Sequence, residues 1–199
     1  GASTEHVRVI EDSYTAQAII ITDVENNQIT AFHPGAMQHA HCIDVPTGGD
    51  VRLGIIAPDG RDAMLLHAAQ LVDADIPFIF DPGQQLPMFD GAELRQFVSQ
   101  ARWVALNDYE ARMLCERTGE SLASLSCGTL GGVVVTLGAE GCEVWEQGRR
   151  IHVPGRSAMA IVDPTGCGDA FRAALLYGLE RGWTLQRSAA LGNVIGARK

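Results

Sequence analysis

Hydrophobic positions along the chain follow two different rhythms, and the change between them falls near Arg52. Before that point, short runs rich in Val, Ile and Thr predict β-strands, and these runs cover 6–10, 16–22 and 28–32. Between the second and third runs, residues 23–27 predict a hairpin turn, because two asparagines there tolerate positive φ. We therefore expect residues 1–35 to form a small β-rich flap.

From Arg52 onward, apolar strands alternate with helical patterns, and we expect residues 36–199 to form an α/β body. The predicted strands cover 53–57, 78–80, 103–106 and 132–137; the predicted helices cover 61–73, 92–100, 108–118 and 171–179. This alternation indicates β-α-β units, hence a mostly parallel central sheet with helices on both faces in three layers. Ligands bind beyond the carboxyl ends of such strands, where we expect 81–83, 107–108 and 136–138 to meet.

Composition and charge exclude several classes of function. Apolar residues make up 46% and charged residues 20%, which is ordinary globular usage and excludes disorder. No apolar run approaches the roughly 20 residues of a membrane span. The net charge of −9 argues against nucleic acid or an anionic membrane as a partner. Lys199 is the only lysine, which excludes nucleotide sites that need a phosphate-binding lysine.

Five widely spaced cysteines without a Cys-x-x-Cys pair favour a reduced, cytoplasmic protein over a disulfide framework or a zinc site. The sequence shows no initiator Met and no signal peptide. It opens on a polar stretch and stops inside an apolar helical pattern. From this we expect the biological protein to be longer at both ends.

The strongest chemical signal is the segment 163–171, Asp-Pro-Thr-Gly-Cys-Gly-Asp-Ala-Phe. Its two glycines allow a tight turn before a helix, so backbone N–H groups and the positive helix end converge on an anion site. A carboxylate at Asp169 beside a phosphate makes chemical sense if it takes a proton from an attacking hydroxyl. The alternative is structural, since glycine-rich turns start many helices and Asp is favoured in a first turn. A dinucleotide fingerprint would need glycine where Phe171 stands, which disfavours a nicotinamide-dependent dehydrogenase.

The segment 163–169 resembles the Asp-Thr-Thr-Gly-Ala-Gly-Asp signature of the PfkB family of ribokinase-like sugar and nucleoside kinases, with Pro164 and Cys167 as departures. Residues 107–110 resemble the Asn-x-x-Glu motif of that family, and residues 136–141 resemble its nucleotide-binding Thr-x-Gly-x-x-Gly stretch. The early β hairpins resemble its substrate lid. The resemblance covers essentially the whole chain and implies a ribokinase-like fold without the family's N-terminal part and final helices.

The resemblance also implies roles for individual residues. Asp169 would be the catalytic base, and the amides of Gly166, Cys167 and Gly168 would form the anion hole for the transferring phosphoryl group. Asn107 and Glu110 would hold the water network around Mg²⁺ and the phosphates. The residues implied to line the ATP site are Thr136, Gly138 and Gly141. Those that match a monovalent-cation site, occupied by K⁺ in some members, are Asp163 and Thr165.

Each of these roles has a plainer competitor. Asn107 followed three residues later by Glu110 is also the pattern of a helix N-cap with its capping-box glutamate. Segments 31–37 and 80–87 look most like bacterial adenosine and nucleoside kinases. Phe32 and Met37 could sandwich a base there, or simply form the core of the lid.

The sequence thus predicts an ATP- and Mg²⁺-dependent kinase that phosphorylates a primary hydroxyl, foremost the 5′-hydroxyl of adenosine or a related nucleoside. Two alternatives stay open: a sugar kinase of the same family acting on ribose or a ketohexose, and a nucleotide-binding module without turnover. The exposed β segment also permits a homodimer through the lid, but nothing in the sequence demands one.

Overall fold

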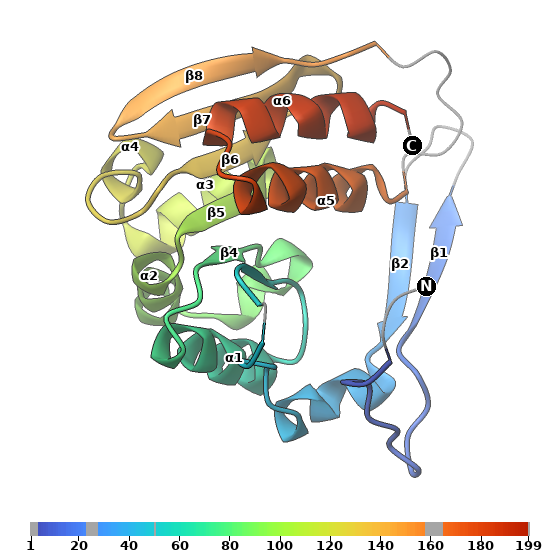
Figure 1. Cartoon of the computed structure of the whole chain (residues 1–199). Helices are drawn as coiled ribbons and strands as arrows, with labels where there is room; N and C mark the ends of the chain where they lie inside the picture. Colours follow the sequence, from blue (N-terminus) through green and yellow to red (C-terminus); the bar gives the residue numbers. More distant parts are fainter. Residues whose placement is uncertain (1–3, 23–27, 50, 158–164, 199) are drawn as a thin grey trace.

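The computed structural model describes residues 4–22, 28–49, 51–157 and 165–198. Its centre is one six-stranded sheet with the strand order β3-β4-β5-β6-β7-β8 (Figure 1). The strands are β3 (Gly54–Ile56), β4 (Phe78–Phe80), β5 (Trp103–Asn107), β6 (Val133–Thr136), β7 (Gly141–Glu146) and β8 (Arg149–Pro154).

The first four strands of this sheet are parallel, and β7 and β8 continue it as an antiparallel hairpin. The prediction of a mostly parallel sheet is confirmed, although the β7–β8 hairpin was not among the predicted strands. Because parallel strands end at the same edge, the segments 81–83, 107–108 and 136–138 follow neighbouring carboxyl ends, as expected.

Helices cover both faces of the sheet, which confirms the three-layer α/β/α architecture. The larger helices are α1 (Arg61–Asp73), α2 (Gly91–Gln100), α3 (Asp108–Thr118), α5 (Cys167–Glu180) and α6 (Leu185–Gly196). Shorter turns of helix are α4 (Leu122–Leu125), η1 (Gly35–Cys42), η2 (Gly83–Met88) and η3 (Gly138–Glu140). Within the described ranges, no helix has the length and apolar character needed to cross a bilayer.

Alternating residues of the strands feed two separate hydrophobic cores. Phe78 and Phe80 pack with α1, α2 and α3 on one face, whereas Ile79 between them packs with α5 and α6 on the other. The same alternation divides Val133 and Val135 from Val134. Side chains on a strand alternate between its faces, so a fully apolar strand supplies both cores at once.

No strand within the described part of residues 1–35 belongs to this sheet. Strands β1 (Gln17–Thr22) and β2 (Gln28–His33) form a separate antiparallel pair, which stands at one side of the molecule (Figure 1). Its apolar side chains are largely open to solvent: Ile21 is 67% exposed and Ile29 75% exposed. The predicted turn at 23–27 lies outside the described residues.

The predicted strand at 6–10 is wrong. The chain there is irregular, with a turn in which the Val7 amide donates to the Thr4 carbonyl at 3.1 Å. Val7 and Val9 are both exposed. The alternating apolar pattern is real, but no strand of the described part of the chain pairs with this segment, and an unpaired extended segment is not stabilised as a strand.

A stack of three phenylalanines forms the part of the core between the sheet and α2. The rings of Phe80 and Phe97 stack with their centroids 4.4 Å apart, and Phe89 meets Phe97 edge-on at 5.0 Å. All three side chains are fully buried. The core therefore couples the end of β4 to η2 and α2, next to the carboxyl edge of the sheet.

Replacing Phe97 by alanine should lower the free energy of unfolding by about 3–5 kcal/mol, because it opens a cavity and removes both ring contacts. Urea denaturation measures this loss. Phe32→Ala is the matched control, since Phe32 is 46% exposed and its loss should cost much less. Equal losses for the two variants would contradict the assigned core.

Candidate active site

Two of the motif residues lie side by side where β5 and β6 end. Asn107 is the last residue of β5 and pairs in register with Thr136, the last residue of β6. The Thr136 hydroxyl donates to the carbonyl of Leu106 at 3.3 Å and so ties the two strand ends together. Gly138 in η3 and Gly141 at the start of β7 follow directly, so the predicted nucleotide-binding stretch borders the same edge.

Asn107 and Glu110 form a complete capping box at the start of α3. The Glu110 amide donates to the Asn107 side chain at 2.7 Å, and the Glu110 carboxylate accepts from the Asn107 amide and from Asn107 Nδ2, each at 2.8 Å. The helix-capping interpretation of this motif is therefore confirmed. Glu110 is also only 8% exposed, and this burial raises the pKa of its carboxyl.

The same pair offers oxygen atoms that are able to accept hydrogen bonds from the waters of a hydrated Mg²⁺. Each Glu110 oxygen accepts one hydrogen bond from Asn107, which leaves further lone pairs for waters around a metal. Magnesium prefers oxygen ligands and keeps several of its own waters, so a contact through water suits this arrangement. The two residues fit the ion without any change in the capping box.

Helix α5 begins at Cys167 with Gly166 as its N-cap, directly after the tight turn that the glycine-rich segment predicts. Gly166 has a φ of 83°, in the left-handed region, and its carbonyl accepts the first helical hydrogen bond from Ala170 at 2.9 Å. Cys167, Gly168 and Asp169 form the first turn, where helical N–H groups have no partner within the helix. Asp169 is exposed there. Helix starts of this kind are able to bind anions, and here a carboxylate lies beside the first-turn amides.

An ion pair joins this helix to the end of β4. Arg172 Nη2 donates to Asp81 Oδ1 at 2.8 Å, and Arg172 Nε faces Asp81 Oδ2. Asp81 is only 2% exposed, and burial raises the pKa of its carboxyl against the opposing effect of Arg172. Burial alone would lower the pKa of Arg172, but the hydrogen bond and charge of Asp81 outweigh it and the pKa is raised.

Sequence reasoning placed Asp81 at the correct edge but assigned no role to it or to Arg172. The available signal was that Arg172 follows Asp169 by three residues, so both lie on one face of α5. The guanidinium also interacts electrostatically with Glu110 and Asp169. The structure thus gathers three carboxylates and one guanidinium, carried by β4, α3 and α5, at one edge.

The other predicted residues lie on other segments of the chain. Phe32 lies on the separate β hairpin, and Met37 is partly buried in η1. Thr165 immediately precedes Gly166 and is exposed. Asp163 lies outside the described residues.

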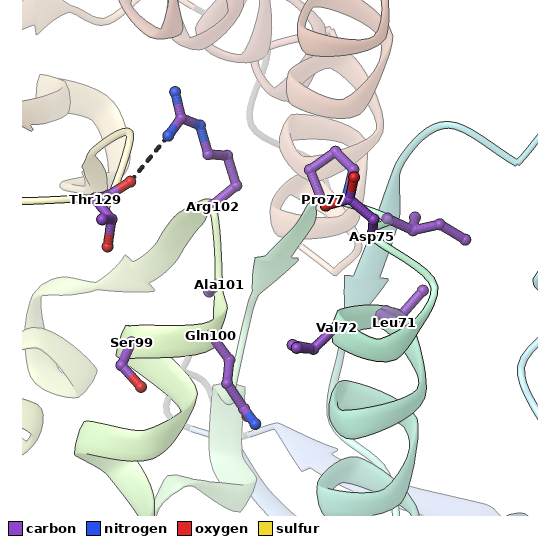
Figure 2. A pocket seen from close by; sticks show the side chains of 10 residues that line it. Leu71, Val72, Asp75, Pro77, Ser99, Gln100, Ala101, Arg102 and Thr129 are labelled. Atoms are coloured by element: carbon purple, nitrogen blue, oxygen red, sulfur yellow. Dashed lines mark hydrogen bonds between the residues drawn. The ribbon is translucent and has the colours of Figure 1, made fainter.

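A hollow of about 400 Å³ lies at the opposite edge of the sheet. Figure 2 shows its lining by Pro77, Ala101 and Arg102, which precede β4 and β5, and by Thr129, whose carbonyl accepts from Arg102 Nη1 at 2.9 Å. This is the amino edge of the parallel strands. Since ligands of such sheets bind at the carboxyl edge, the hollow is not the candidate active site.

The fold is that of an α/β protein in which the start of a helix and a cluster of charged side chains lie at the carboxyl edge of a mostly parallel sheet. Residues 1–198 match the model of the pfkB family of carbohydrate kinases. The chain belongs to this family.

Solved structures agree with this assignment. The nucleoside kinase of Burkholderia thailandensis in complex with inosine is 45% identical, with a TM-score of 0.93, and the match covers 98% of this chain and 65% of that one. The same kinase in complex with ADP-inosine is 44% identical, with a TM-score of 0.90, over 98% of this chain and 61% of that one. The fold is therefore ribokinase-like.

A more distant relative is the nucleoside kinase of Methanocaldococcus jannaschii, an archaeal member of the ribokinase family. Its sequence is 27% identical over 92% of this chain and 59% of that protein. Its crystal structure matches with 25% identity and a TM-score of 0.83, over 94% of this chain and 62% of that one. The chain thus spans about three-fifths of the length of the relatives it matches.

The raised pKa of Glu110 predicts how a Glu110→Gln variant depends on pH. In the unfolded chain Glu110 ionises near its ordinary value of 4.5, whereas in the folded protein burial delays ionisation to higher pH. As the pH rises through this interval, ionisation favours the unfolded wild type, and glutamine has no such effect. The stability of the variant relative to wild type should therefore be higher at pH 7 than at pH 4. Thermal unfolding at both pH values measures this, and a difference that is constant or reversed would contradict the assigned burial.

Proposed function

We propose that the chain is the nucleotide-binding and catalytic part of an ATP- and Mg²⁺-dependent nucleoside kinase. It transfers the γ-phosphoryl group of ATP to the 5′-hydroxyl of a nucleoside, with inosine and adenosine as the first candidates. Inosine is the ligand of the 45% identical kinase from Burkholderia thailandensis. The chain spans about three-fifths of the length of these relatives, so the activity of the whole protein is part of the proposal.

The observation that carries the proposal is the start of α5. Unpaired first-turn amides and the positive helix end converge beside Asp169, which is exposed. A carboxylate next to a phosphate repels it, so a pure binding site would not favour this arrangement. A kinase does need a carboxylate at this place, because a base beside the phosphoryl group can accept the proton of the attacking hydroxyl.

In the proposed reaction, Asp169 accepts the 5′-hydroxyl proton as the new O–P bond forms and the bond between the β- and γ-phosphates of ATP breaks. The amides of Gly166, Cys167 and Gly168 donate to the oxygens of the transferring group, whose charge is spread over them in a loose transition state. Bound Mg²⁺ supplies the positive charge that neutralises the phosphates, and Glu110 with Asn107 orients its water shell.

The remaining predicted residues have supporting roles in this proposal. Thr136, Gly138 and Gly141 line the ATP site at the end of β6. Phe32 and Met37 contribute apolar surface for the base when the β hairpin, formed within residues 1–35, closes as a lid. Thr165, together with Asp163, belongs to a monovalent-cation site suited to K⁺.

The proposal is tested by ADP release from the full-length protein with ATP and Mg²⁺, offered adenosine, inosine, cytidine, ribose or fructose in turn. Turnover with nucleosides alone would support it. Turnover with a free sugar would leave the assigned site residues unchanged but replace the nucleoside by a sugar as the acceptor, in agreement with the carbohydrate kinases of the family. ATP binding without any turnover would favour a nucleotide-binding module.

Asp169→Asn should lower turnover by about 10²–10⁴-fold and leave the affinity for ATP nearly unchanged, because it removes the base but keeps the shape of the side chain. Steady-state kinetics and nucleotide titration measure the two effects. Asp62→Asn, in the first turn of α1, is the control for a helix-end charge remote from the site and should leave turnover unchanged. A residual turnover within tenfold of wild type would remove Asp169 from the role of base.

A second capping box, at the start of α2, makes it possible to distinguish a catalytic from a structural role of Glu110. Asp90 and Glu93 form the same box at the start of α2 that Asn107 and Glu110 form at α3. Glu110→Gln and Glu93→Gln each change the glutamate of a capping box, and Glu93→Gln also removes an ion pair with Arg61, yet only Glu110→Gln should lower turnover, by about tenfold or more, and raise the Mg²⁺ requirement. Turnover measured across Mg²⁺ concentrations tests this, and equal activity of the two variants would leave Glu110 as a cap only.

A further inference from the structure

We propose that Arg172 is a positioning residue, which acts by fixing the start of α5 on the end of β4 through its ion pair with Asp81. The inference rests on the proposed kinase function and deepens it, because it assigns a role to two residues outside the PfkB motifs described above. Neither residue is proposed to touch ATP or the nucleoside.

The first argument is geometric. Asp81 and Arg172 are 91 residues apart, and their contact joins the carboxyl edge of the sheet to the helix that carries Asp169. Both Nε and Nη2 of the guanidinium face the carboxylate of Asp81. Only Nη2 makes a hydrogen bond, to Oδ1, whereas Nε lies against Oδ2 as an ion pair without a hydrogen bond, so one charge-assisted hydrogen bond and the ion pair together hold the helix on the strand end. A small displacement of α5 would therefore break the pair.

The second argument is the contact of the same guanidinium with the anion-binding turn. A Cβ atom built on Gly168 would lie 2.7 Å from Arg172 Nη1, closer than such atoms approach. The guanidinium therefore lies directly against the backbone of this turn, while its other edge is held by Asp81. It bridges the strand end and the turn whose amides are proposed to hold the phosphoryl group.

The third argument is the charge of the cluster. Arg172 interacts with Asp81, Glu110 and Asp169, and Asp81 and Glu110 are both largely buried. Without the guanidinium, three carboxylates would repel one another and an incoming phosphate. With the guanidinium present, its positive charge balances the negative charge of Asp81, and the pair as a whole adds little net charge to the ATP site.

The competing explanation is that the pair serves stability alone. A buried ion pair can often be replaced by neutral residues of similar shape with little loss of stability, whereas removal of one partner strands a buried charge. The two explanations therefore differ for a double variant that removes both charges. A stability role predicts that folding and turnover recover together, and a positioning role predicts that folding recovers without turnover.

The experiment compares Arg172→Gln, Asp81→Asn, the double variant of both substitutions and Arg172→Lys in the full-length kinase, by thermal unfolding and steady-state kinetics. Each neutral single variant should lower the Tm and lower kcat by about 100-fold, since misplacement by about 1 Å costs that much. The double variant should recover most of the Tm but not kcat. In the double variant, which leaves the net charge of the cluster unchanged, the KM for ATP should stay within about threefold, because the removed pair is not proposed to bind ATP.

Arg172→Lys keeps the charge without the planar fork, so it should restore the Tm more than kcat. Arg150→Gln is the matched control: Arg150 pairs with the partly buried Glu143 on the β7–β8 hairpin, and its loss should leave kcat unchanged. A double variant or an Arg172→Lys variant with wild-type kcat would overturn the positioning role alone. Absence of turnover by the wild-type protein with every acceptor would overturn the proposed function, and this inference with it.

Discussion

Four parallel strands end at one edge of the sheet, and the whole candidate site depends on this arrangement. The residues that follow β4, β5 and β6 are far apart in the sequence, yet the parallel register makes their strand ends neighbours. Within the sheet, the backbone N–H and C=O groups of the strands bond to one another. Side chains that are able to bind a ligand therefore lie beyond the carboxyl ends of the strands. Helix α5 then completes the site from the opposite core, and its packing through Phe171 and Leu175 determines how close Asp169 comes to this edge.

In the proposed function, the site has to combine negative side chains with a negatively charged ligand in a chain whose only lysine is its last residue. Three devices do so without a lysine. The amides at the start of α5 offer partial positive charge, Asp81 is paired with Arg172, and the oxygens of Glu110 and Asn107 suit a hydrated metal. Buried carboxylates are tolerated here because each has hydrogen-bonding or ionic partners. In this proposal, Asn107 and Glu110 serve the chemistry as well as the helix cap that the structure shows.

The prediction from sequence was best where local patterns decide the outcome. Residues only a few positions apart determine three of the correctly predicted features. These are the fully apolar strands, the start of α5 at the glycine-rich turn, and the cap formed by Asn107 and Glu110. The prediction of a strand at 6–10 was wrong because a strand needs a partner, and the alternating valines do not reveal whether one exists. For the same reason the β7–β8 hairpin, which is stabilised by pairing with β6, was not identified.

The sequence by itself determined the α/β class, the edge at which the functional residues lie, and the motifs that mark the family. Periodicity and capping chemistry are written in consecutive residues, so they can be read without the fold. Only the tertiary structure decided that Arg172 meets Asp81, and that Glu110 is buried within reach of their charges. Arg172 and Asp81 are 91 residues apart, and they meet because the two hydrophobic cores hold β4 and α5 in place. A pattern of neighbouring residues in the sequence does not reveal such a contact.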